Sequence, residues 1–285
     1  NGAISYHLTP PRDGMTIRSL TDHDQERGFL TIFWSPMPWI AESKMENCQD
    51  LWRVGGVSVA GFAHVDENMP CQDAHAYVLR DGCCLVAAVA DGAGSARFGH
   101  LGAAAIASAV VEVVSKGVSG ARIDFDLVSK LLIEAVNETT KNLIQKPECE
   151  ANGVPLRLSD FATTLVAVVA NQSGGRFFHV GDGAGTALAL NDPTEATTSK
   201  PQNGEYANET FFVTMENWER YLETISFDSN FDTILLMSDG VTPLAMSRGC
   251  ESPFMNFVAP VIEFVRTADD DTAKTALTNT LLDNK

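Results

Sequence analysis

The sequence has few basic residues, few long apolar stretches and no metal-binding pattern of cysteine or histidine. It holds 20 Lys and Arg against 37 Asp and Glu, a net charge of −17. Phosphate backbones repel a chain this acidic, which argues against a nucleic-acid partner. The longest uninterrupted apolar run covers residues 83–90, whereas about 20 residues are needed to cross a bilayer. We therefore expect neither a nucleic acid nor a membrane as partner.

The six cysteines form no Cys-x-x-Cys pair, and no His-x-x-x-His spacing is present, so nothing indicates a zinc site. No charged-then-apolar secretory segment opens the sequence either. We therefore expect a cytoplasmic protein with reduced thiols, most of them small core residues. The cysteines are Cys48, Cys71, Cys83, Cys84, Cys149 and Cys250.

Residues 1–50 differ from the rest, because prolines and two tryptophans stand among mixed charges without a sustained period. We interpret them as an N-terminal arm, a linker or the remnant of another module, and residues 51–285 as one catalytic-size domain. Apolar patterns predict strands at 54–60, 76–79, 84–90, 163–170, 176–180, 186–190, 211–214 and 234–237. They predict helices at 101–114, 125–144, 253–265 and 272–282, with Leu127, Leu131, Ala135 and Val136 on one face of the second. Short links between successive strands imply antiparallel pairing and an α+β fold.

An Asp-Gly pair follows an apolar strand at three places. These are Val-Ala-Asp91-Gly92, Val-Gly-Asp182-Gly183 and Met-Ser-Asp239-Gly240, and Asp73 stands just before another strand. A single Asp-Gly pair is most simply a turn. Three of them without a Lys or Arg beside them suggest carboxylates that converge, repel one another and need cations. Hard divalent ions such as Mg²⁺ or Mn²⁺ prefer such oxygen ligands.

Seven ordered blocks carry a resemblance to a known family. They are Gly61-Phe-Ala-His64, Asn68-Met-Pro-Cys-Gln-Asp-Ala74, Ala90-Asp-Gly-Ala-Gly-Ser95, Phe161-Ala-Thr-Thr-Leu165, Val180-Gly-Asp-Gly183, Gly204-Glu-Tyr-Ala-Asn-Glu-Thr210 and Ser238-Asp-Gly240. From residue 54 onward the sequence resembles the type 2C (PPM) metal-dependent protein serine/threonine phosphatases, in particular their bacterial subgroup. The resemblance implies an antiparallel β-sandwich flanked by helical layers, with the metals at one end of the sandwich.

The resemblance also implies roles for individual residues. Asp91 resembles the aspartate that bridges two Mn²⁺ or Mg²⁺ ions, and the Gly92 carbonyl resembles a ligand to one of them. Asp73 and Asp239 resemble ligands to single ions, and Asp182 matches an aspartate that helps to hold a third ion in some members. The implied reaction on a phosphorylated protein is direct attack on the phosphomonoester by a water that bridges two ions.

Two departures concern the groups around the metals. Many members carry a histidine after the first Asp-Gly pair as a candidate general acid, where this chain has Ala93, so a water or His64 would have to replace it. Many also carry an arginine five positions before the first metal aspartate, where this chain has Asn68. Arg97 is a candidate replacement for gripping phosphate, because an arginine fork matches phosphate oxygens; the simpler interpretation is an exposed residue at a helix start.

The third departure concerns the end of the domain. The family closes with an Asp-rich motif on a final strand, whereas here residues 269–271 precede the last predicted helix, whose positive end suits three acidic residues. We therefore expect the domain to lack its final strand. The segment 204–210 is either a surface loop or, by resemblance, a flap that touches substrate.

Three alternatives thus stay open at the sequence level. The first is an active phosphatase, and the second is a catalytically degenerate relative that binds a partner. The third is a receiver domain with a phosphate-accepting aspartate, which the antiparallel order disfavours. A haloacid-dehalogenase-type phosphatase would need Asp-x-Asp after its first strand, and Asp91-Gly-Ala has no second aspartate. The oligomeric state is not indicated by the sequence.

Overall fold

Two antiparallel sheets form the centre of the protein. The computed structural model describes residues 17–19, 27–34, 52–60, 70–80, 83–118, 122–145, 154–202 and 210–283. The first sheet has the order β1-β4-β5-β6-β7-β10, and the second has the order β3-β2-β11-β8-β9. Every pairing within them is antiparallel, which confirms the expected fold class.

The strands of the first sheet are β1 (Ile17–Ser19), β4 (Asp73–Arg80), β5 (Cys84–Asp91), β6 (Leu165–Asn171), β7 (Gly174–Val180) and β10 (Glu223–Phe227). Those of the second are β2 (Arg27–Trp34), β3 (Arg53–Ala60), β8 (Ala184–Ala189), β9 (Asp192–Ser199) and β11 (Thr233–Met237). The helices are α2 (Gly99–Gly117), α3 (Phe125–Leu143), α4 (Thr242–Ala245), α5 (Met255–Thr267) and α6 (Asp270–Asp283), with single turns η4 (Leu158–Phe161), η5 (Trp218–Tyr221) and η6 (Arg248–Cys250).

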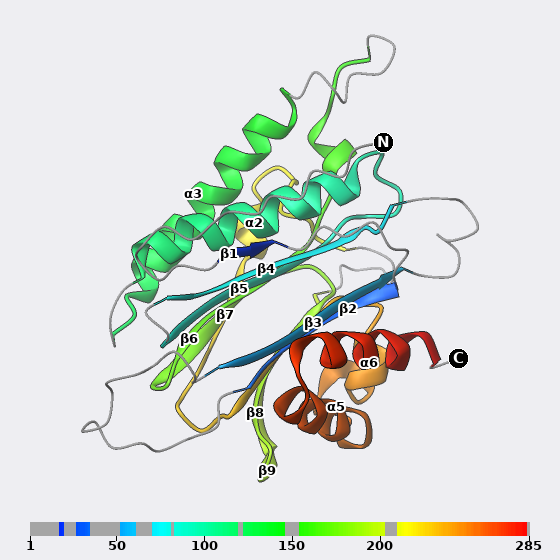
Figure 1. Cartoon of the computed structure of the whole chain (residues 1–285). Coiled ribbons are helices and arrows are strands. Elements are labelled where there is room, and N and C mark those ends of the chain that lie inside the picture. The colour runs from blue at the N-terminus through cyan, green and yellow to red at the C-terminus, as the bar shows by residue number, and fades with distance from the viewer. Residues whose placement is uncertain are drawn as a thin grey trace.

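The sheets stack face to face and helices cover their outer faces. In Figure 1, α2 and α3 lie over the first sheet, while α5 and α6 lie against the second. Between the sheets, alternate side chains of β5 and β6 meet those of β11 in one apolar cluster, represented by Leu85, Val168 and Ile234. Because successive strand residues point to opposite faces, the residues between them face the helices.

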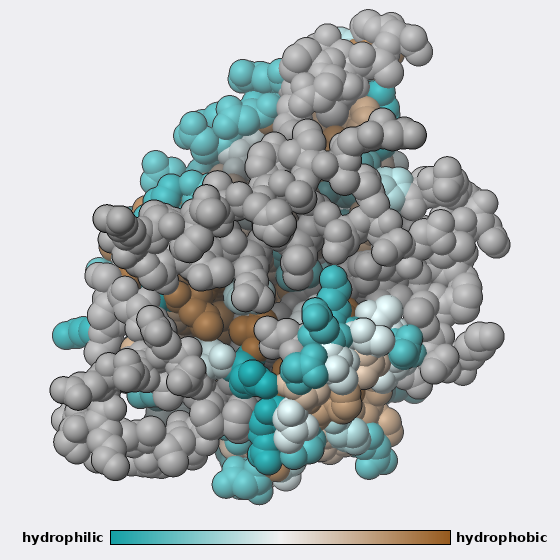
Figure 2. All heavy atoms as spheres, viewed as in Figure 1, coloured by the Kyte–Doolittle hydropathy of each residue, from teal (hydrophilic) through white to brown (hydrophobic). Residues whose placement is uncertain are grey.

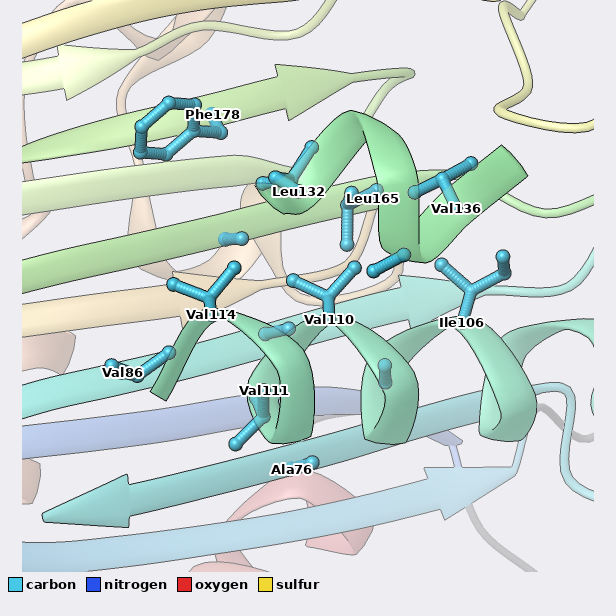
Figure 3. Close-up of a cluster of buried hydrophobic side chains, with 14 of the residues drawn as sticks. Ala76, Val86, Ile106, Val110, Val111, Val114, Leu132, Val136, Leu165 and Phe178 are labelled. Carbon is cyan, nitrogen blue, oxygen red and sulfur yellow. The ribbon is translucent and has the colours of Figure 1, made fainter. Parts of the chain in front are cut away.

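The outer face of the first sheet packs tightly against α2 and α3. Ile106, Val110 and Val114 of α2 point toward Leu132 of α3 and toward the strands beneath, including Phe178 of β7 (Figure 3). A matching cluster joins the second sheet to α4, α5 and α6. Strands that are apolar on both faces, such as β5, β6 and β11, are therefore buried between two helical layers.

The buried face of α3 is displaced from the predicted one. Leu127 is 41% exposed, whereas Val128 and Leu132 are each 1% exposed. Ala135 and Val136 are buried as expected. Hydrophilic residues cover the outer side of this helix (Figure 2). The prediction for Leu127 was wrong because a period of 3.6 residues fits two neighbouring registers, and only contact with α2 distinguishes them.

This difference gives a matched test of stability on one helix. Leu132→Ala is expected to lower the free energy of unfolding by about 2–5 kcal/mol, because a fully buried leucine leaves a cavity. Leu127→Ala should change it by less than about 0.5 kcal/mol, the usual range at an exposed position. Urea denaturation of both variants measures the difference. Equal losses would contradict the placement of α3.

Several strands lie where the sequence predicted none. β1 and β2 come from the segment before residue 50, and β2 pairs with both β3 and β11. β9 and β10 are polar edge strands, each paired within its sheet on one side only. They lack the apolar alternation of a strand with a buried face.

The predicted strand at 211–214 was wrong. Met215 N donates to Phe212 O over 3.1 Å and closes a turn there. Phe211 stacks on Tyr221 with ring centroids 4.0 Å apart. These apolar residues are therefore buried by a turn packed against the sandwich instead of by a strand.

One cysteine also departs from expectation. Cys83 is disulfide-bonded, whereas Cys71, Cys84 and Cys250 are free thiols. The expectation that all the thiols are reduced was wrong for Cys83, because sequence spacing does not show which cysteines approach in space. Among the described residues, no helix combines the length and the apolar character that a membrane crossing requires.

Candidate functional site

Asp73 and Asp91 face each other across two neighbouring strands. Asp73 begins β4 and Asp91 ends β5, and the register pairs them directly. Residues in such opposite positions have Cβ atoms about 4.5–5.5 Å apart and point to the same face. Ala90 packs under the helices, so Asp91 points to the other face, between the sheets. Two carboxylates thus share one end of the sandwich.

Asp182 and Asp239 reach the same end from other strands. β5 and β7 run in the same direction, because both pair antiparallel with β6. Asp182, which follows β7, therefore lies at the same edge as Asp91. Asp239 follows β11 of the second sheet and is close enough to raise the pKa of the other three carboxyl groups. The structure brings together all four aspartates that the sequence singled out.

Burial and mutual repulsion change the acidity of this group. Burial, and next the charge of Asp239, raises the pKa of Asp73 to about 7, although a hydrogen bond from Ser238 acts in the opposite direction. Burial, and then the charges of Asp73 and Asp239, raises the pKa of Asp91 well above its usual range. Burial also raises the pKa of Asp182, partly offset by the Thr210 hydroxyl. Without cations, the deprotonated cluster is therefore unfavourable at neutral pH.

The main chain of Asp91 is held by two threonines that precede β6. Its N–H donates to Thr164 Oγ1 over 3.0 Å, and its carbonyl accepts from Thr163 Oγ1 and from Thr164 N, each over 2.9 Å. Both threonines belong to the sequence motif Phe161-Ala-Thr-Thr-Leu165, which by itself predicts no role for them. Two hydroxyl residues next to a wholly apolar strand were the available signal.

Gly92 lets the chain turn directly under α2. A Cβ atom at Gly92 would overlap the backbone carbonyl of Gly99, and one at Gly99 would lie 2.8 Å from Ala93 O. Gly92 N donates to Gln72 O over 3.0 Å, which keeps the turn beside the start of β4. The backbone after Asp91 is thus fixed between β4 and the first turn of the helix.

The corner at Asp182 has its own contacts. Gly181 exchanges two hydrogen bonds with Gln202, from Gly181 N to Gln202 Oε1 over 3.1 Å and from Gln202 N to Gly181 O over 2.7 Å. Thr210 Oγ1 donates to Asp182 Oδ2 over 2.6 Å. No pattern in the sequence predicts a role for Gln202, because its contact depends on how the segments after β7 and β9 approach each other in space.

Several other residues named from the sequence either have different partners or lie outside the described residues. Arg97 forms an ion pair with Asp160 (Nη1 to Oδ2, 3.7 Å), and its guanidinium lies 5.0 Å from the ring centroid of Phe98. His64 and Asn68 lie outside the described residues, as do positions 204–209. Asp269 caps α6, accepting from Thr272 N over 2.9 Å. Within the described residues α6 is the last element.

The four carboxylates fit hard divalent ions if each ion takes one or two of them. Within the described part of the chain, no three Asp, Glu, His or Cys side chains converge closely enough to chelate one ion. Asp73 Oδ1 is nevertheless buried without a hydrogen-bond partner among the described residues, as expected for an oxygen that serves as a cation ligand. Magnesium and manganese ions commonly take one or two carboxylates and keep several waters. The four oxygen-bearing side chains fit that pattern.

A surface pocket of about 480 Å³ lies elsewhere. It is lined by Glu195, Thr197, Ser226, Phe227, Asp228 and Asn230. Phe227 pairs with Gly175 near the start of β7, whereas Asp182 follows the end of that strand. The pocket is therefore toward the opposite end of the sandwich, and it is not part of the aspartate site.

Comparisons with known proteins identify the family to which the sequence is related. The sequence model of the family described as Protein phosphatase 2C matches residues 60–282. Serine/threonine-protein phosphatase 3 of Escherichia coli (strain K12) is 28% identical over 225 residues, which cover 77% of this chain and 85% of that protein.

Solved structures with a similar arrangement include a serine/threonine phosphatase of S. agalactiae. It has a TM-score of 0.46 and 14% identity, covering 94% of this chain and 92% of that one. PppA of Pseudomonas aeruginosa has a TM-score of 0.45 and 17% identity, covering 69% of this chain and 79% of that one. Because the family match spans most of the sequence, this chain belongs to the protein phosphatase 2C family.

Proposed function

We propose that this protein is a Mn²⁺- or Mg²⁺-dependent phosphatase that hydrolyses phosphoserine and phosphothreonine in proteins. The observation that carries the proposal is the convergence of four aspartates from both sheets, with the pKa of three of them raised by burial and by one another. Structural carboxylates normally have a basic partner or hydrogen bonds that lower the pKa. A cluster with the opposite property is typical of a site built for cations.

The individual residues take the following parts in this proposal. Asp91 would help to hold both ions, and the Gly92 carbonyl, Asp73 and Asp239 would each be a ligand to one of them. Asp182 would hold a third ion where one binds. When bound, such ions act as Lewis acids and lower the pKa of a water molecule. Thr163 and Thr164 hold the main chain of Asp91, from which the carboxylate projects.

Protonation of the leaving oxygen needs a group other than the residue after Gly92. Ala93 stands there, and its methyl side chain cannot donate a proton. Its backbone N–H donates to Ala162 O over 2.9 Å. His179 is fully buried against Ser199, with its Nδ1 and the serine Oγ 2.7 Å apart. We therefore propose solvent water or His64 as the general acid.

Phosphate recognition is proposed for Arg97 and for Asn68, which stands five positions before Asp73 in the sequence. The Arg97 guanidinium is partly exposed and is held by Asp160 at a distance of 3.7 Å, longer than a good ionic hydrogen bond. An exposed ion pair of this kind contributes little and is easily exchanged for a phosphate.

A phosphoprotein fits the charge of the chain better than a nucleic acid does, since the net charge is −17. We also propose the cytoplasm as the place of action. The disulfide at Cys83 is the observation that favours an oxidising compartment instead.

A second candidate function is supported by specific positions. Ala93 stands where many members of the family have a histidine, and Asn68 stands where many have an arginine. A relative that binds phosphoproteins without turnover would combine these features. This second function predicts that the protein binds a phosphopeptide without releasing phosphate from it.

The deciding experiment measures phosphate release from a phosphothreonine peptide by the metal-stripped protein. With Mn²⁺ added, we expect steady turnover that EDTA abolishes, and much slower turnover of the matching phosphotyrosine peptide. Peptide binding without turnover would establish the degenerate alternative. Equal activity with and without metal would refute the proposed mechanism.

A further inference from the structure

Thr164 touches two of the aspartate corners at once. It is 4% exposed and stands immediately before β6, the strand that lies between β5 and β7. Its hydroxyl accepts from Asp91 N over 3.0 Å, and its own N–H donates to Asp91 O over 2.9 Å. One residue therefore binds both polar atoms of the Asp91 main chain.

The other side of Thr164 lies against the corner of Asp182. A Cβ atom built on Gly181 would come within 2.5 Å of Thr164 Cγ2 and 2.6 Å of its Cβ. Gly181 has φ +119°, a conformation that side-chain-bearing residues rarely adopt. The methyl group of Thr164 thus occupies the space that the missing side chain leaves, directly before Asp182.

We propose that Thr164 is a positioning residue that sets the separation of Asp91 and Asp182 in the metal site. This inference rests on the proposed function, because it assigns a purpose to the spacing of the two carboxylates. β5 and β7 are not neighbours in the sheet, so their ends have no backbone hydrogen bonds to each other. The hydroxyl of Thr164 holds one corner, and its methyl group supports the other.

The two groups on the threonine can be removed separately. Thr164→Val keeps the shape and the methyl contact with Gly181, but it leaves the Asp91 N–H without its acceptor. Thr164→Ser keeps the acceptor and removes the methyl group. A matched control is Thr186→Val in the second sheet, because Thr186 is also fully buried and shares a 2.7 Å hydroxyl hydrogen bond, with Thr198.

The experiment measures the Mn²⁺ concentration that gives half-maximal phosphate release. We expect Thr164→Val to raise it about 10- to 100-fold, the range found when a group that orients a metal ligand is removed. Thr164→Ser keeps the hydrogen bond to Asp91 and loses only the methyl contact with Gly181, so it should raise that concentration by a smaller factor than Thr164→Val. Thr186→Val should leave that dependence unchanged even where its melting temperature falls.

Hydrogen exchange of the metal-free protein gives a readout that does not need activity. The amides of Asp91 and Gly92 should exchange faster in Thr164→Val than in Thr164→Ser or the wild type. An unchanged Mn²⁺ dependence in folded Thr164→Val, or equal impairment by serine and valine, would overturn the proposal. If the wild type shows no metal-dependent turnover, the proposed function fails, and unchanged exchange at Asp91 would then overturn the positioning role separately.

Discussion

Asp91→Asn is expected to lower Mn²⁺-dependent hydrolysis of a phosphothreonine peptide by more than about 100-fold. Loss of a residue that merely orients a metal ligand reduces affinity or activity about 10- to 100-fold, and loss of a bridging ligand should exceed that range. Asparagine keeps the shape of the side chain and the backbone hydrogen bonds to Thr163 and Thr164. Measuring kcat/KM at saturating Mn²⁺ isolates the effect of the carboxylate charge.

The same substitution should stabilise the metal-free protein at pH 7.5. Burial and the charges of Asp73 and Asp239 raise the pKa of Asp91, so its ionised form opposes folding. A neutral amide removes that opposition, and the melting temperature in EDTA should rise. A structural carboxylate with a basic partner would show the opposite sign.

The control for both measurements is Asp192→Asn. Asp192 is exposed on the edge strand β9, outside the aspartate group. It should change neither the activity nor the melting temperature appreciably. Near-wild-type turnover by Asp91→Asn would eliminate the proposed mechanism, and a lower melting temperature without metal would contradict the electrostatic account of the site.

The second large effect is stabilisation by Mn²⁺ that grows with pH. At a free Mn²⁺ concentration 100 times the dissociation constant, the folded state gains about 2.7 kcal/mol. For a chain of this size that corresponds to a rise in melting temperature of roughly 5–10 °C. We expect the rise at pH 7.5 and a much smaller one at pH 5.

The sign follows from the carboxyl groups. Asp73 has a pKa of about 7 in the folded, metal-free protein, against an ordinary value of 3.8. Between these values the folded state binds more protons than the unfolded state, so the contribution of Asp73 to stability falls as pH rises. Metal ions compete with those protons, and at pH 5 the protonated carboxyls bind them poorly.

The shift caused by Mn²⁺ is a better measure than the absolute melting temperature. His179 is buried and His75 is half-buried; loss of solvation lowers the pKa of each to about 4, and the charge of Lys274 adds to the effect at His75. They destabilise the folded state as pH falls below their ordinary value of 6.5, so their effect on stability opposes that of the aspartates over the same range.

Melting curves with EDTA and with Mn²⁺ at each pH cancel this common contribution. A matched series on Asp91→Asn should show a smaller and flatter shift. Equal Mn²⁺ shifts at pH 5 and pH 7.5 for the wild type would show that the aspartates are not protonated in the metal-free site.

The sequence by itself determined which residues could carry the chemistry. Asp91, Asp182 and Asp239 each follow an apolar strand and precede a glycine, and this local pattern depends only on neighbouring residues. The antiparallel order followed in the same way from the short links between strands. A motif at 161–165 was also visible, although its threonines had no assigned role.

Only the tertiary structure decided how these residues meet. The register of β4 and β5 places Asp73 opposite Asp91, and the stacking of the sheets brings Asp239 close to Asp91, although more than 140 positions separate these two residues in the sequence. The strands β9 and β10 were missed because their stability comes from a single neighbouring strand and not from their own apolar pattern. The raised pKa values have the same origin, because burial and repulsion depend on distances in space.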